Sequence, residues 1–175
     1  SREPQHVLDM YGTQGSDGSY AANCLLARRL AERGVRFIHL YHRGWDHHGD
    51  LTSYMKTCCG LTDKPTWALL TDLKQRGLLE DTLVIWGGEF GRTPKISKRA
   101  AREHHQHCYF SIWAGAGVQP GRTIGESDAR AERPITEPIS PLMAGTTIAE
   151  LCGVGAQQRA EMKVLDGGRV INELL

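Results

Sequence analysis

Thr82-Leu83-Val84-Ile85-Trp86-Gly87-Gly88-Glu89-Phe90-Gly91-Arg92-Thr93-Pro94 is the stretch of the sequence that says most about the fold. Its first five residues form an apolar run of the length of a buried strand. The glycine pair that follows lets the backbone turn sharply and present the carboxylate of Glu89. The stretch therefore predicts a strand that carries polar side chains just beyond its C-terminal end.

Helices and short strands alternate on both sides of this stretch. Residues 20–33 have the apolar spacing of a helix between the capping residue Ser19 and Gly34, and residues 35–41, rich in strand formers, follow at once. Further helices are expected over residues 51–59, 64–76 and 139–152, and a third strand over residues 109–114. The alternation predicts an α/β fold in which helices flank a largely parallel sheet.

The order of the elements also predicts where a site would form. In open α/β sheets, ligands bind beyond the carboxyl ends of the strands. Asp46 and His48 follow the first strand and Glu89 follows the second, so these side chains are expected to meet at one sheet edge. Residues 1–175 are expected to form a single α/β domain, and the absence of an initiator methionine indicates a piece of a longer protein.

Length, charge and cysteine content narrow the function classes. A chain of 175 residues with 40% hydrophobic content is enough for one soluble domain with a core. A formal net charge of +1 gives no strong field for nucleic acid or an anionic membrane, so neither is expected as a partner. No apolar stretch approaches the roughly 18 residues of a membrane-spanning helix. The five cysteines lack C-x-x-C spacing, so no disulfide framework is expected.

Histidines gather in two short segments of the chain. Of the eight histidines, seven lie between His39 and His48 or between His104 and His107. Each segment also holds a carboxylate, Asp46 in the first and Glu103 in the second. Imidazole plus carboxylate is a ligand set that zinc, iron and manganese prefer, so the two segments predict a metal site.

Within each segment, only some of the side chains can reach one ion. Alternate residues of an extended segment share a face, so Asp46 and His48 can point inward together while His47 points elsewhere. Of the neighbours His104 and His105, one is expected to be a ligand and the other to lie outside the first shell of ligands. The alternative is a polar loop whose histidines bond backbone carbonyls.

Glu89 and Arg92 follow the central strand and add possible chemistry to the histidine clusters. A carboxylate beside an arginine can be a simple salt bridge, but next to two histidine clusters Glu89 is interpreted as a metal ligand or general base. Arg92 can clamp an anionic substrate group through two N–H donors. The basic residues Lys95 to Arg102 have helical spacing and are interpreted as a solvated face, with anion capture as the alternative.

Three motifs together resemble a known family. They are Trp45-Asp46-His47-His48, the phrase from Leu73 through Gly87-Gly88-Glu89-Phe90-Gly91-Arg92-Thr93-Pro94, and Arg102-Glu103-His104-His105. They resemble the bacterial domain-of-unknown-function family 1501 (DUF1501), which is grouped with the sulfatase-like branch of the alkaline phosphatase superfamily. The resemblance implies an alkaline phosphatase or sulfatase-like α/β fold, of which this chain would be an incomplete C-terminal half.

The function implied by the resemblance is metal-dependent hydrolysis of a phosphate or sulfate ester. The nucleophile is expected in an N-terminal part, so the chain alone is expected to be inactive. The substrate would be a small anionic ester, the cofactor a divalent zinc, manganese, iron or calcium ion, and the location periplasmic or in the cell envelope. The oligomeric state is left open by the sequence.

The resemblance also implies roles for individual residues. Asp46, His48, Glu89 and His105 are the expected metal ligands, and Glu89, Arg92 and His104 are the expected catalytic residues. The alternative function is a non-catalytic metal- or ligand-binding protein that retains the fold, because Phe90 stands where the phosphatases usually carry a histidine.

Overall fold

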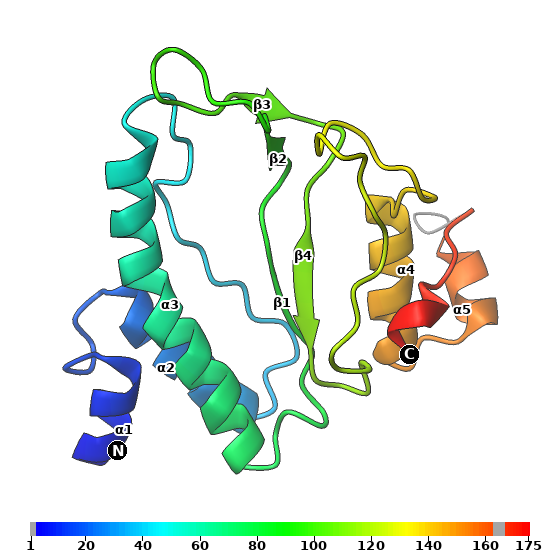
Figure 1. Ribbon diagram of the computed structural model, residues 1–175. Coiled ribbons are helices and arrows are strands. Elements are labelled where there is room, and N and C mark those ends of the chain that lie inside the picture. The colour runs from blue at the N-terminus through cyan, green and yellow to red at the C-terminus, as the bar shows by residue number, and fades with distance from the viewer. Residues whose placement is uncertain (1–2, 163–166) are drawn as a thin grey trace.

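The computed structural model describes residues 3–162 and 167–175. Helices α1 to α3 lie on one side of the strands and α4 and α5 on the other (Figure 1). In chain order the elements are α1 (Gln5–Tyr11), α2 (Tyr20–Glu32), α3 (Leu51–Gln75), β1 (Val84–Gly87), β2 (Gly91–Arg92), β3 (His104–His105), β4 (Ser111–Ala114), α4 (Pro141–Leu151), α5 (Ala156–Glu161) and the 3-10 helix η1 (Asn172–Leu174).

The strands form two small antiparallel sheets. β1 pairs with β4, with Val84 opposite Ala114 and Gly87 opposite Ser111. β2 pairs with β3. Over the described residues there is no larger parallel sheet, so the prediction of a largely parallel, alkaline phosphatase-like α/β fold is wrong.

The physical reason lies in the connection between β1 and β4. Parallel neighbours require a crossover, usually a helix, that carries the chain back to the starting end of the sheet. Here residues 88–110 form the β2–β3 hairpin instead and return the chain in the opposite direction. The apolar character of β1 predicted a strand correctly, but it carried no information about the direction of its partner.

The predicted strand over residues 35–41 is also absent. The segment belongs to no helix or strand, and the backbone of residues 36–41 makes no backbone hydrogen bond to any other described residue. Phe37 and Tyr41 are 70% and 81% exposed. A strand needs a neighbouring ladder to satisfy its N–H and C=O groups, so strand-forming residues alone did not make one.

Helix α2 begins where its predicted capping residue places it, and α4 begins with a similar cap that the sequence analysis did not single out. The Ser19 hydroxyl accepts a hydrogen bond from the Ala22 N–H at the start of α2. The Ser140 hydroxyl does the same for the Met143 N–H at the start of α4, with Pro141 in the first turn. These helices are confirmed because a cap and an apolar stripe are local signals.

Helix α3 is one continuous element where the sequence suggested two. It runs over 25 residues with Pro65 in its interior. Proline removes one hydrogen bond within a helix, but the apolar stripe continues on both sides of it. Ala68, Leu69 and Leu73 are buried in the core, and this packing stabilises the helix across the proline.

The core lies between the first three helices. It is formed by residues of α1, α2 and α3, namely Val7, Tyr11, Cys24, Leu25, Ala68, Leu69 and Leu73. The sheet of β1 and β4 is less covered, and Ile85 and Ile112 remain 41% and 53% exposed. No helix in the described part of the chain is long and apolar enough to cross a membrane.

A buried ion network ties the three helices together. The Arg28 side chain is 2% exposed and its nitrogens lie 2.9 Å from Glu3, 2.6 Å from Glu32 and 2.8 Å from Asp72. Two of these nitrogens, Nε and Nη2, lack hydrogen-bond geometry, so their pairing is chiefly electrostatic. The Tyr11 hydroxyl donates to Asp72 at 3.1 Å. Burial and the Asp72 carboxylate raise the pKa of Tyr11 above its ordinary value.

Candidate metal centre

The loop before α3 presents two side chains outward around a buried one. His47 is 5% exposed. Its Nε2 atom lies 2.5 Å from the Gly44 carbonyl oxygen and 3.7 Å from the Cys58 sulfur. Asp46 and His48, on either side of it, are exposed. The loop therefore has the alternation that the sequence indicates, with His47 serving as its anchor.

The β2–β3 hairpin brings the third side chain to the same place. Arg92 lies opposite His104 in the register of the hairpin. The Thr93 N–H donates to the Glu103 carbonyl oxygen at 2.9 Å. Gly91 makes the close packing possible, since a Cβ atom there would lie 1.9 Å from the carbonyl oxygen of Cys108. The hairpin thus fixes the position of His104 through its backbone.

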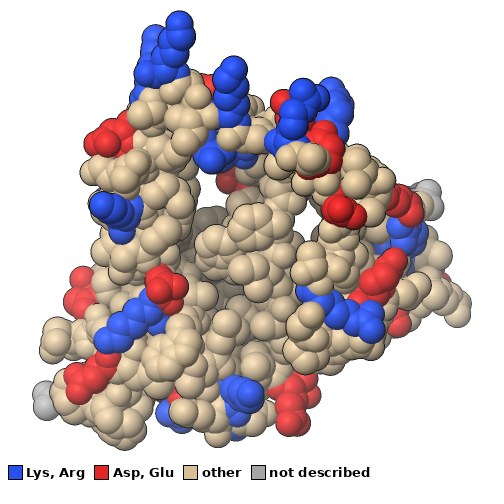
Figure 2. All heavy atoms as spheres, in the orientation of Figure 1, with Lys and Arg blue, Asp and Glu red and all other residues tan. Residues whose placement is uncertain are grey.

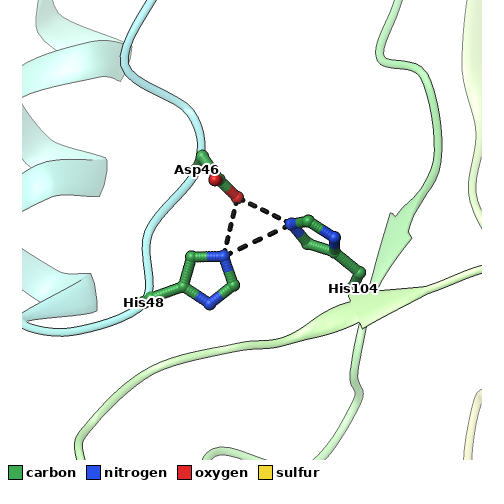
Figure 3. A group of neighbouring side chains, drawn as sticks. All are labelled: Asp46, His48 and His104. Atoms are coloured by element: carbon green, nitrogen blue, oxygen red, sulfur yellow. Dashed lines mark hydrogen bonds and ion pairs between the residues drawn. The ribbon is translucent and has the colours of Figure 1, made fainter.

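Asp46, His48 and His104 converge on one point (Figure 3). The Asp46 Oδ1 atom lies 2.9 Å from His48 Nε2 and 2.9 Å from His104 Nε2. The two Nε2 atoms are 3.3 Å apart. Two ligand atoms around a tetrahedral zinc ion with ordinary bond lengths lie about 3.3 Å apart. The three atoms therefore fit the spacing of ligands around one metal ion.

Glu103 orients one of the two imidazoles. Its Oε2 atom lies 2.7 Å from His48 Nδ1. A carboxylate at that nitrogen favours the tautomer with the proton on Nδ1, which leaves the Nε2 lone pair available to a metal. The sequence placed Glu103 in the cluster without a role. A carboxylate directly before a candidate ligand histidine could have indicated this role. Glu103 precedes His104 in the sequence but contacts His48 of the other segment.

Arg92 is paired with the carboxylate of Asp46. Its Nη1 atom lies 2.6 Å from Asp46 Oδ1, and its guanidinium carbon lies 5.5 Å from the centre of the Phe90 ring. Hydrogen bonds to His104 and Arg92 lower the pKa of the Asp46 carboxyl group well below its usual range. Asp46 is therefore ionised at neutral pH, as a metal ligand must be.

The other two predicted ligands lie outside the group of three. Glu89 is exposed, and its Oε1 atom lies 3.8 Å from Arg92 Nη2. His105 Nε2 lies 2.8 Å from the Glu132 carbonyl oxygen instead. The structure thus brings Asp46, His48 and His104 together and leaves Glu89 at the edge of the cluster. The assignment of Glu89 and His105 as ligands stays a prediction.

A family model described as "Protein of unknown function (DUF1501)" matches residues 1–175 of the sequence. The chain belongs to the DUF1501 family. The family membership that the three motifs predict is therefore confirmed. Neither the curated proteins nor the solved structures give a match to this DUF1501 chain.

The β2–β3 loop beside the candidate metal centre of this DUF1501 chain carries several basic side chains. Figure 2 shows lysine and arginine side chains at the upper left edge, where Figure 1 draws the loop between β2 and β3. In this loop Lys95, Lys98 and Arg99 are exposed, whereas Arg102 donates to the carbonyl oxygens of Thr93 and Pro94. Their helical spacing does not form a helix, because the residues belong to a hairpin loop.

Proposed function

We propose that this DUF1501 chain binds a divalent metal ion through Asp46, His48 and His104, and that the site serves hydrolysis of a phosphate or sulfate ester. The observation that carries the proposal is the convergence of three ligand atoms, 2.9 to 3.3 Å apart, from a loop and a distant hairpin. The resemblance of the motifs to the sulfatase-like branch supports the choice of ester.

The donor set favours some metals over others. Two imidazole nitrogens and one carboxylate oxygen suit zinc, manganese or iron better than calcium, which prefers oxygen ligands. A metal in such a site supplies polarisation of an ester oxygen and a lower pKa for a bound nucleophile. Glu103 holds the His48 ring in the orientation that exposes Nε2.

Arg92 and Glu89 are proposed to bind the anionic group of the ester and to transfer a proton. The Arg92 guanidinium can hold an anionic ester group through paired N–H donors. The Glu89 carboxylate lies at the exposed edge of the cluster, where it can take a proton as a general base. The nucleophile is proposed to come from a part of the protein outside residues 1–175.

Non-catalytic metal binding is the second candidate function. The ring of Phe90 lies 4.5 Å, between ring centres, from His104. This aromatic side chain takes a position beside a ligand where it can neither bind metal nor move a proton. That observation favours a site in which the metal is held but no bond is broken.

Metal analysis separates these candidates from a purely polar cluster. Protein purified without a metal-affinity tag is expected to hold about one zinc, manganese or iron ion per chain, and Asp46→Ala and His104→Ala should lose it. His39→Ala is the matched control, since His39 contacts Tyr41 outside the group. Wild-type protein that holds no ion after incubation with each metal would contradict the proposed site.

Turnover then separates hydrolysis from binding alone. The full protein is assayed with an aryl phosphate and an aryl sulfate, and Asp46→Ala is expected to abolish the rate that wild type shows. Tight metal binding without any ester hydrolysis would support the non-catalytic function instead.

A further inference from the structure

One oxygen atom in the candidate metal centre has three partners. Asp46 Oδ1 lies 2.6 Å from Arg92 Nη1, closer than its 2.9 Å distances to His48 Nε2 and His104 Nε2. The shortest of the three contacts is therefore made by the side chain that cannot be a metal ligand. A guanidinium group is cationic and has no lone pair to offer a metal ion.

A guanidinium and a divalent ion at one carboxylate oxygen oppose each other. Two positive groups within a few ångströms repel, and each weakens the hold of the carboxylate on the other. The Arg92 contact to Asp46 Oδ1 is therefore expected to loosen when an ion binds between Asp46, His48 and His104. Arg92 and the metal compete for Asp46.

The surroundings allow Arg92 to move a short way without leaving the site. Its Nη2 atom lies 3.8 Å from Glu89 Oε1, and its guanidinium is packed near the Phe90 ring. The side chain is 23% exposed, so its N–H groups can reach a ligand from solvent. Once it has left Asp46, the guanidinium stays beside the metal, and its N–H groups are available to donate to an anion.

We infer that Arg92 is a metal-operated anion site: binding of the metal releases Arg92 from Asp46, and the released guanidinium then binds a tetrahedral oxyanion such as sulfate or phosphate. The inference rests on the proposed metal site. It makes the order of binding definite, with the metal first and the anionic ester second. It also couples the two ligands, so each strengthens the binding of the other by the same factor.

Replacing Arg92 has opposite effects on the two ligands. Arg92→Gln removes the competitor for Asp46, so the metal should bind several-fold more tightly in chloride. It also removes the anion's partner, so sulfate should no longer strengthen metal binding. A residue that only held the hairpin in shape would weaken metal binding when replaced.

Calorimetric titration with Zn²⁺ in chloride and in sulfate buffer tests the inference. The two buffers are matched in ionic strength, because salt screens charged pairs at a surface. In wild type, sulfate is expected to tighten Zn²⁺ binding about tenfold, within the usual range of coupling between sites. In Arg92→Gln, binding in chloride should be tighter than in wild type, with no effect of sulfate. Arg99→Gln is the matched control, since Arg99 is an exposed arginine of the same hairpin, and it should behave as wild type.

Arg92→Lys keeps the charge but not the paired N–H groups, and it carries the test if circular dichroism shows Arg92→Gln to be unfolded. We expect Arg92→Lys to bind Zn²⁺ in chloride as wild type does and to lose most of the sulfate effect. Zn²⁺ binding that is unchanged or weaker in Arg92→Gln, or an equal sulfate effect in all variants, would overturn the inference while leaving the metal site in place. Absence of Zn²⁺ binding in wild type would instead overturn the proposed function.

Discussion

Two arginine–aspartate pairs in this chain differ in their surroundings. Arg28 and Asp72 lie between the helices, with side chains 2% and 4% exposed. Arg92 and Asp46 lie in the candidate metal centre, with side chains 23% and 62% exposed. The buried pair is almost closed to solvent and holds the helices together, whereas the exposed pair is open to a ligand from solvent. Burial is therefore expected to separate a structural ion pair from one that a ligand can open.

The largest expected effect comes from breaking the buried pair. Arg28→Met removes the buried cation that Asp72 shares with the more exposed Arg76, and removal of one partner from a buried ion pair costs about 3–5 kcal/mol. The free energy of unfolding, measured with urea, should fall by about 3 kcal/mol or more. Arg33→Met is the control, since Arg33 is exposed, and should change it by less than about 0.5 kcal/mol. A small loss in Arg28→Met would show that the network is not structural.

Gly91→Ala tests whether the hairpin holds the metal centre together. Its added Cβ would meet the Cys108 carbonyl oxygen, and overpacking of this kind costs about 1–3 kcal/mol. Because the hairpin carries His104, metal affinity should fall together with stability. At Gly88 the nearest atom to an added Cβ is 3.9 Å away, so Gly88→Ala serves as the control. Equal behaviour of the two variants would contradict the close packing at Gly91.

Glu103→Gln tests the residue that orients the ligand His48, without changing a metal ligand. Loss of a partner that orients a ligand histidine typically weakens metal binding about tenfold or more. We therefore expect metal affinity to fall about tenfold while the urea unfolding curve stays unchanged. An affinity equal to that of wild type would show that the His48–Glu103 contact does not orient the ring.

The smallest effect is expected from the neighbour of His104. The His105 imidazole lies at the Glu132 carbonyl oxygen rather than in the group of three. His105→Ala should therefore change metal affinity by less than about twofold, near the scatter of a neutral surface substitution. A loss as large as that in His104→Ala would establish His105 as a ligand, as the sequence predicts.

The sequence predicted local structure well and long-range pairing poorly. Helix α2 begins directly after Ser19, the cap that the sequence predicts, since a capping hydroxyl and an apolar stripe act within a few residues. The partner and direction of β1 depend on residues 111–114 and on the hairpin between them, which no local pattern encodes. Residues 35–41 have strand-forming side chains but no ladder, so propensity alone was misleading there.

In the candidate site, too, the local arrangement could be predicted from the sequence and the long-range contacts could not. Alternation along the chain predicts that Asp46 and His48 point to one side and His47 to the other. The structure places the three side chains in this way. The choice between His104 and His105 depends on the register of β2 against β3, which places His104 opposite Arg92. The Arg92–Asp46 contact joins two distant segments and has no sequence signal, yet the proposed coupling of metal and anion binding depends on it.

The most direct test of the account is X-ray absorption of the protein loaded with one Zn²⁺ ion per chain. We expect two imidazole nitrogens and at least one oxygen at about 2.0–2.1 Å from the zinc, the ordinary zinc bond lengths. His104→Ala should reduce the imidazole count to one, and His105→Ala should leave it at two. A spectrum without imidazole scattering, or one that is the same in wild type and His104→Ala, would contradict the metal centre formed by Asp46, His48 and His104.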